Sequence, residues 1–236
     1  MTDMIELFMY AVLPAVVSST ALPTHDVINV TSDTHLTNKP RGPVGASLEQ
    51  VVQGLSDEEP TIIVGDVIDG YYLDEIESEL NMVDDMKAQR DVYLSLGAGH
   101  DYRTGGLSFD QAMNRFDTRN MVLRSGDYHI VLFSGTDPTW LHKVLPKYDN
   151  IIFMTHIPFK SDGTVELSRG WFHGKDITQP SPSPVEDVII ENLEKISYFV
   201  FGHLHLSADT TVFGKQAYFC AWDNMCTIRK GVMHTK

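Results

Sequence analysis

Short apolar runs recur along this chain, and each one stops near residues that can bind a metal ion. The runs are Val27–Val30, Thr61–Val64, Val92–Leu96, Ile151–Met154 and Tyr198–Phe201. Their short length and their β-branched and aromatic content indicate buried strands. The segments that follow them are Asp33–His35, Gly65–Asp69, Gly97–Asp101, Thr155–His156 and Gly202–His205. Because the carboxyl ends of parallel strands share one edge of a sheet, these segments can converge on one point.

Helical patterns separate the expected strands. One helix is predicted around an apolar stripe with acidic residues on the other face, formed by Leu73, Ile76, Leu80 and Val83. Ser47 is a good N-cap for a second, short helix. Ser183 followed by Pro184 favours the start of another helix. This alternation of strands and helices predicts an α/β fold.

Antiparallel strands are expected beyond the last of these segments. Thr211–Phe213 and Gln216–Phe219 flank Gly214–Lys215, which we interpret as a two-residue hairpin turn. Such additions predict two packed mixed β-sheets flanked by helices. The length of 236 residues suits a single domain over residues 26–236, preceded by an N-terminal helix or extension over residues 1–25.

The charge of the chain limits its partners. There are 18 Lys and Arg residues against 32 Asp and Glu residues, which gives a formal net charge of -14. Such a chain repels polyanions at long range, and no Lys/Arg cluster suggests the basic face of a duplex-binding protein. Duplex nucleic acid is therefore not expected as a partner, whereas a small anion is compatible because bound cations reverse the local field.

The N-terminal stretch Leu7–Leu22 is largely apolar. Its leader carries Asp3 and Glu6 and no basic residue, which is the wrong sign for a signal peptide. The stretch is shorter than the roughly 20 residues that a bilayer requires, and Pro14 interrupts it. We expect no transmembrane segment and a cytoplasmic protein, with a signal peptide or membrane-surface contact as the alternative.

The two cysteines, Cys220 and Cys226, have a spacing that fits no common zinc motif. Both lie in the β-rich tail, so buried free thiols are expected. A disulfide would require an oxidising compartment.

The strand-end residues combine imidazoles and carboxylates without thiolates: Asp33, His35, Asp66, His156, His203 and His205. This donor set suits Mn²⁺, Fe or Zn²⁺ better than Mg²⁺ or Ca²⁺. It is too large for one ion and suits two ions that share a carboxylate. Two ions about 3.5–4 Å apart can hold a hydroxide between them and clamp both oxygens of a displacement at phosphorus. Each motif alone is a weak signal, and only the ordered set is specific.

The ordered set resembles the motifs of the calcineurin-like metallophosphoesterases. The family pattern is D-x-H, G-D-x-x-D, G-N-H-D/E, a lone His and G-H-x-H, and the resemblance runs from about Asp26 to Trp222. Trp140 and the segment Thr155–Pro158 are similar to the phosphodiesterase-type members. The resemblance implies a four-layer α/β/β/α sandwich and two divalent ions, Mn²⁺ being favoured.

The resemblance also implies a role for each motif residue. The first ion would be held by Asp33, His35 and His205, the second by His156 and His203, and Asp66 would bridge them. His100 would face the leaving group or the developing charge. Asp101 would orient His100.

Two positions depart from the family pattern. The family's Asn, a ligand of the second ion, falls on Gly99, which leaves a coordination position open; we expect activity to be retained. The Arg-Gly pair of protein-phosphatase members is replaced by Gly70–Tyr71 after Asp69, which disfavours large protein substrates.

Three further residues are predicted substrate contacts. Tyr102 and Arg103 follow His100 closely enough to reach a phosphate, with plain surface as the alternative. His173 lies in the segment Trp171–His173, whose rings could stack on a base or simply pack within the loop.

These observations predict a binuclear metal-dependent phosphoesterase. It would hydrolyse phosphodiester or phosphomonoester bonds of a nucleotide-type or other small substrate through a metal-bridging hydroxide. Two alternatives stay open. One is a nuclease acting on single-stranded or terminal nucleic acid, and the other is a catalytically impaired metal-binding homologue acting through a protein interface.

Overall fold

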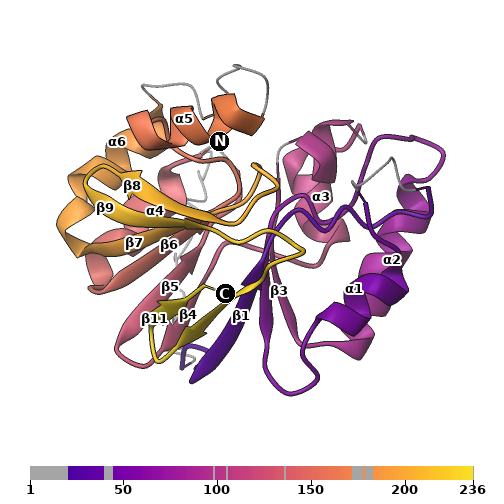
Figure 1. Ribbon diagram of the computed structural model, residues 1–236, viewed down its shortest axis with the longest axis horizontal. Coiled ribbons are helices and arrows are strands. Elements are labelled where there is room, and N and C mark those ends of the chain that lie inside the picture. The colour runs from indigo at the N-terminus through magenta and orange to yellow at the C-terminus, as the bar shows by residue number, and fades with distance from the viewer. Residues whose placement is uncertain are drawn as a thin grey trace, which may run out of the picture.

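Two mixed β-sheets lie face to face between two layers of helices (Figure 1). This computed structural model describes residues 21–39, 45–97, 99–104, 106–135, 137–171, 178 and 183–235, without the side chains of residues 103, 104, 162, 170 and 171. The helix or extension predicted over residues 1–25 therefore lies almost entirely outside the described residues.

The first sheet has the strand order β11-β10-β1-β2-β3. Its strands are β1 (Val27–Thr31), β2 (Thr61–Val64), β3 (Val92–Ser95), β10 (Cys226–Arg229) and β11 (Val232–His234). β1, β2 and β3 are parallel, and β10 and β11 extend the sheet as antiparallel strands. Its outer face is covered by α1 (Leu48–Gly54), α2 (Ile76–Gln89) and α3 (Phe109–Arg115).

The second sheet has the order β4-β5-β6-β7-β9-β8. Its strands are β4 (Met121–Ser125), β5 (Tyr128–Leu132), β6 (Ile151–Thr155), β7 (Ile196–Phe201), β8 (Ala208–Val212) and β9 (Lys215–Phe219). The inner strands β5, β6, β7 and β9 are parallel, and the edge strands β4 and β8 are antiparallel. The helices on this side are α4 (Thr139–Val144), α5 (Asp162–Trp171) and α6 (Pro184–Glu191), with short turns at η2 (Leu145–Lys147) and η3 (Leu193–Lys195).

The apolar strands are buried on both faces. In β2, Ile62 and Val64 pack into the core between the sheets, while Ile63 packs against the helices. Such strands read as continuous apolar runs because neither side meets water. The predicted four-layer α/β/β/α arrangement is confirmed.

Local signals placed two helix starts correctly. Ser47 caps α1 and accepts a hydrogen bond from the Gln50 amide, and Ser183 caps α6 with Pro184 in its first turn. α2, however, begins at Ile76, and Leu73 is 71% exposed instead of lying on the buried stripe.

The β8–β9 turn lies one residue earlier than predicted, at Phe213–Gly214. Both residues have positive φ, 51° and 75°, as a type I′ turn requires.

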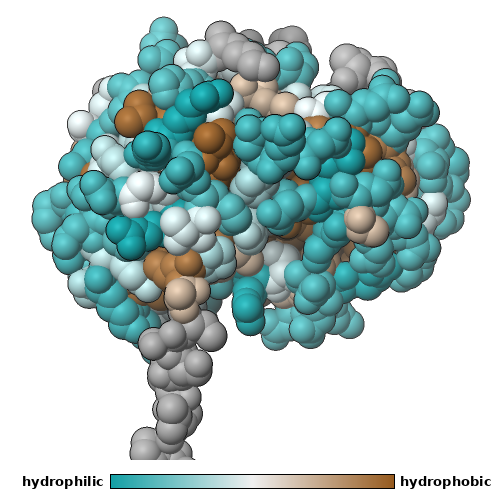
Figure 2. Space-filling view, turned by 90° about the horizontal axis from the view of Figure 1, so that it is seen from below, coloured by the Kyte–Doolittle hydropathy of each residue, from teal (hydrophilic) through white to brown (hydrophobic). Residues whose placement is uncertain are grey.

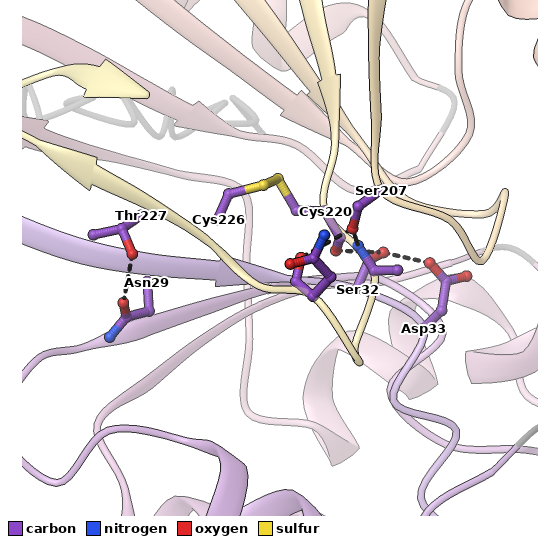
Figure 3. The surroundings of a disulfide bond; sticks show 9 residues. Asn29, Ser32, Asp33, Ser207, Cys220, Cys226 and Thr227 are labelled. Carbon is purple, nitrogen blue, oxygen red and sulfur yellow. Dashed lines mark hydrogen bonds between the residues drawn. A yellow bond between two sulfur atoms is a disulfide. The ribbon is translucent and has the colours of Figure 1, made fainter. Parts of the chain in front are cut away.

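Cys220 and Cys226 form a disulfide (Figure 3), so the prediction of free thiols is wrong, although both residues are buried as expected. Cys220 follows β9 in the second sheet, whereas Cys226 begins β10 in the first sheet. The bond therefore links the two sheets. Packing of the two sheets against each other brings the two sulfur atoms together, and the C-x5-C spacing alone carries no sign of it.

The surface view from below is mainly hydrophilic, with apolar side chains in small separate groups (Figure 2). Among the described residues, the large apolar side chains that are exposed include Tyr71 and Leu73, close after Asp69 in the chain. No helix in the described ranges is long and apolar enough to cross a membrane.

Candidate metal centre

The strand ends bring the predicted ligands together. Asp33 and His35 follow β1, Asp66 follows β2, and His205 follows β7. One ligand atom from each of these four residues lies within 4.8 Å of the others. Nε2 of His35 is 3.2 Å from Nε2 of His205, which in turn is 3.4 Å from Oδ1 of Asp33. Nitrogen and oxygen lone pairs that face one another this closely form a site for a cation.

A second group of ligand atoms shares Asp66 with the first. It consists of Asp66, His156 after β6 and His203 after β7, again with ligand atoms within 4.8 Å of one another. Nε2 of His156 lies 3.1 Å from Oδ2 of Asp66. Nδ1 of His156 donates a hydrogen bond to the Val64 carbonyl at 2.8 Å, which leaves Nε2 as the nitrogen available to a metal.

The backbone is strained at most of these ligands. Positive φ values occur at Asp33, His35, Asp66, His203 and His205, between 44° and 72°. Non-glycine residues with φ in this range cost free energy and persist only where the surroundings hold them, typically at functional sites. The tertiary structure therefore holds the ligand side chains in place against local conformational preference.

Burial and charge set the protonation of the imidazoles. Burial lowers the pKa of His35 to about 3 and, together with repulsion from His156, the pKa of His203 to about 4. Both rings are neutral near pH 7, as metal binding requires. Burial opposes the charged form of His156 as well, but attraction to Asp66 and Asp33 outweighs it and raises the pKa of His156 to about 10.

The residues fit a pair of divalent cations. Oδ1 of Asp66 is buried with no hydrogen-bond partner, and so is Nδ1 of His35. A buried carboxylate oxygen without a partner is costly, and a bound cation supplies the missing interaction. Imidazole and carboxylate donors suit Mn²⁺, Fe or Zn²⁺. Of the two groups, the first would hold one ion, the second would hold the other, and Asp66 would contact both.

His100 lies at the edge of the first group. Its ring centroid is 4.5 Å from that of His35, and its side chain is 30% exposed. Nδ1 of His100 donates to the Asp69 carbonyl and is 3.7 Å from the Asp69 carboxylate. The carboxylate beside this ring is thus that of Asp69, the second acid of the Gly65–Asp69 segment, which the sequence interpretation left without a role.

Asp101 does not orient His100 as predicted. Its carboxylate is fully buried and accepts hydrogen bonds from the amides of Val67, Ile68 and Gly97, at 2.7, 3.1 and 2.6 Å. Burial and repulsion from the nearby Asp66 raise the pKa of Asp101 to about 7. Asp101 therefore joins the loop after β2 to the loop after β3, a role that only the fold could reveal.

Of the three predicted substrate contacts, only Tyr102 has a side chain that the structure describes. Tyr102 is 6% exposed and packs against Phe109 within the helical core, so its ring is part of the packing and does not reach a substrate. Arg103 lies in the π-helical turn η1 (Gly99–Thr104), and its side chain is not described. His173 lies outside the described residues.

Two glycines follow β3, and only Gly97 lies against the shared ligand Asp66. A methyl group at Gly97 would overlap Oδ1 of Asp66 and lie 2.8 Å from Cδ2 of His156. At Gly99, by contrast, an added Cβ meets no atom within 4 Å. Gly97 therefore allows the Asp66 carboxylate to lie close to the backbone after β3. A glycine near a strand often marks such a close approach. Gly99 instead has room for a side chain.

Comparison with known proteins agrees with this geometry. The calcineurin-like phosphoesterase family model matches residues 27–207. A dimetal phosphatase from Danio rerio superposes with a TM-score of 0.55 at 12% identity, covering 86% of this chain and 92% of that one. A purple acid phosphatase from yellow lupin gives 0.54 at 9% identity, covering 89% and 52%. This chain thus spans about half of the lupin protein. No curated protein sequence matches significantly.

Fold and site together define a metal-dependent hydrolase of phosphoric esters. The chain belongs to the calcineurin-like phosphoesterase family, whose model covers all six predicted ligands.

Proposed function

We propose that this protein hydrolyses the phosphodiester bond of a small, nucleotide-type substrate with the help of two divalent cations, preferably Mn²⁺. The observation that carries the proposal is the pair of ligand groups joined at Asp66. When bound, such a cation pair acidifies a water molecule and neutralises charge on phosphoryl oxygens. The remaining steps fall to side chains of the chain itself.

His100 is positioned to protonate the leaving group. Because Nδ1 donates to the Asp69 carbonyl, Nε2 is the atom that can carry a proton toward a substrate oxygen. The Asp69 carboxylate lies 3.7 Å from the same Nδ1 atom, so both contacts hold the ring by one nitrogen and leave Nε2 available. The ring is half-buried, so it is accessible to a bound ester.

Three features support a small substrate with an aromatic group. Tyr71 is 54% exposed only two residues after Asp69, and its ring meets that of Tyr72 edge-on at 5.1 Å. An exposed aromatic ring can stack on a base. The net charge of -14 opposes long polyanions. The Gly70–Tyr71 pair stands where protein-phosphatase members carry Arg-Gly.

The proposal is tested by Mn²⁺-dependent hydrolysis of bis(p-nitrophenyl) phosphate. We expect Asp66→Asn to lower kcat/KM by at least about 10²-fold, because one neutral amide replaces the carboxylate shared by both ions. Asp209→Asn, on the exposed side of β8, is the matched control and should retain full activity. Equal rates for Asp66→Asn and Asp209→Asn would defeat the proposal.

The cytoplasmic location expected from the acidic leader is a separate proposal, and the disulfide weighs against it. Disulfides persist mainly in oxidising compartments, and Cys220 and Cys226 are joined. Cell fractionation followed by thiol labelling of the acid-quenched, denatured protein decides the matter: a labelled, reduced pair in the cytoplasmic fraction supports the original expectation, and a disulfide-bonded pair in another fraction refutes it.

A further inference from the structure

The disulfide lies beside a segment that carries a ligand of the first metal site (Figure 3). Ser32 precedes Asp33, and its hydroxyl is positioned between two acceptors. One is the Cys220 carbonyl at 3.1 Å, and the other is the Asp33 carboxylate. Ser32 is 1% exposed, so no bulk water replaces either partner. The position of the Asp33 carboxylate is thus coupled to the backbone at Cys220.

The same disulfide-closed loop, residues 220–226, also contacts the segment after His205. The Ala221 amide donates a hydrogen bond to Oγ of Ser207 at 3.1 Å. The Ser207 hydroxyl in turn donates to the Asn224 carbonyl at 2.9 Å. Ser207 follows His205 by two residues, so this loop bonds to residues close in sequence to two ligands of the first metal site, Asp33 and His205.

We propose that Ser32, Ser207 and the Cys220–Cys226 disulfide are positioning residues that hold Asp33 and His205 in ligating geometry, so that affinity for the first ion depends on this disulfide. The inference rests on the proposed function only in assuming that the two ligand groups bind cations.

The physical reason lies in the topology of the loop. Residues 221–225 pass from β9 of one sheet to β10 of the other, and the covalent bond shortens this passage to a closed ring. Breaking the bond gives the loop more conformational freedom. Asp33 and His205, at φ of 57° and 51°, depend on their surroundings to keep a strained backbone. Loosening the loop therefore acts first on these two ligands.

The second metal site has a different support. His156 donates a hydrogen bond to the Val64 carbonyl of β2. The residue after Asp66, Val67, donates its amide to the Asp101 carboxylate, which holds the backbone next to Asp66. None of these groups belongs to the disulfide loop.

The third ligand of the second site, His203, is linked to the first site, because its amide donates to both oxygens of the Asp33 carboxylate at 3.1 and 3.0 Å. The effect on the second ion is therefore smaller than that on the first, but not absent. The proposal therefore predicts an unequal effect on the two ions, which a general loss of stability would not produce.

The disulfide can be opened by a dithiol. The dithiol contributes two electrons and two protons: the Cys220–Cys226 bond breaks to two thiols while the dithiol becomes a disulfide. A cavity of about 170 Å³ reaches this region and is lined in part by Ser207, Asn224 and Cys226. Both cysteines are buried, so reduction requires this region to open, and the affinity for the first ion would then respond to redox state.

The test uses isothermal titration calorimetry and electron paramagnetic resonance of Mn²⁺ bound to the metal-free full chain. In the double variant Cys220→Ser, Cys226→Ser we expect the first-ion Kd to rise about 10- to 100-fold. The second-ion Kd should change less than about threefold. The signal of a coupled ion pair should give way to that of a single ion at limiting Mn²⁺.

Variants that keep the disulfide separate positioning from folding. Ser32→Ala and Ser207→Ala should each weaken the first ion selectively. Thr227→Val is the matched control, because the Thr227 hydroxyl donates to the side chain of Asn29 in the same neighbourhood, away from the ligands (Figure 3). It should bind both ions normally.

Four results would overturn the inference. They are two free thiols in the denatured wild-type protein, unchanged binding in the double cysteine variant, unchanged binding in both serine variants, and an equal loss at both ions. Turnover is measured separately on the same samples. Absent hydrolysis together with normal binding of both ions would refute the proposed function and leave this inference standing.

Discussion

Replacing Gly97 with alanine tests how closely the bridging ligand is enclosed. The added methyl group would overlap Oδ1 of Asp66 and lie 2.9 Å from the Asp66 amide nitrogen. Gly97 does not have positive φ, so alanine accepts its backbone conformation and only the collision opposes the change. The Asp66 carboxylate must therefore move, and it belongs to both ligand groups.

The expected magnitude follows from overpacking. Forcing an extra carbon into a filled interior costs about 1–3 kcal/mol, which corresponds to a fall in Tm of roughly 2–12 °C for a domain of this size. Displacing a group that orients a metal site typically costs about 10- to 100-fold in metal affinity. We expect Gly97→Ala to show both effects.

Gly99→Ala is the matched control, two residues along the same loop. Its Cβ meets no atom within 4 Å, and alanine in this helical turn is neutral or stabilising by up to about 1 kcal/mol. Thermal unfolding of the metal-free protein and calorimetric titration with Mn²⁺ measure the two quantities. If Gly97→Ala binds Mn²⁺ as tightly as Gly99→Ala, the close packing of Gly97 against Asp66 does not affect metal binding, and the reasoning is refuted.

Three further predictions concern the same site. Gly99→Asn should lower the Kd of the second ion about 10-fold, because a side chain at position 99 meets no atom within 4 Å of its Cβ and so has room to add a ligand. An unchanged Kd in calorimetry would show that position 99 does not face the ion. His100→Asn should slow a nucleoside diester about 10²- to 10⁴-fold, but an aryl diester much less, because p-nitrophenolate needs no proton; equal losses would exclude the acid role. His156 should lose a proton when the second ion binds at pH 7.5, since its pKa is about 10 without metal. Calorimetry in buffers of different ionisation enthalpy should show near one proton released.

The raised pKa of His156 also makes the stability of the metal-free protein depend on pH. The pKa of His156 is raised above its ordinary value, so its contribution to the metal-free fold is complete below pH 6.5 and is lost as the pH rises toward 10. Over the same pH interval, the affinity of the site for the second ion rises, because a smaller fraction of His156 is protonated and must lose its proton on binding.

Local sequence signals were sufficient wherever the cause is local. Ser47 and Ser183 mark helix starts because each accepts a hydrogen bond from an amide three residues ahead. The ligand motifs stand at strand ends because parallel strands share one edge of a sheet. That rule brings Asp33 and Asp66 together at the end of the first sheet, whereas His156 follows β6 of the second sheet, so the packing of the two sheets completes the site.

The sequence by itself determined the layered α/β architecture and which metal-binding residues stand at strand ends, since both follow from periodicity and strand boundaries. Only the tertiary structure decided that Asp69 rather than Asp101 lies beside His100, that Tyr102 is packing, and that Cys220 and Cys226 are joined. These outcomes depend on distances between segments from different strands. A side chain's partner is set by where neighbouring elements place their backbone amides, carbonyls and sulfur atoms, and no short-range pattern encodes that placement.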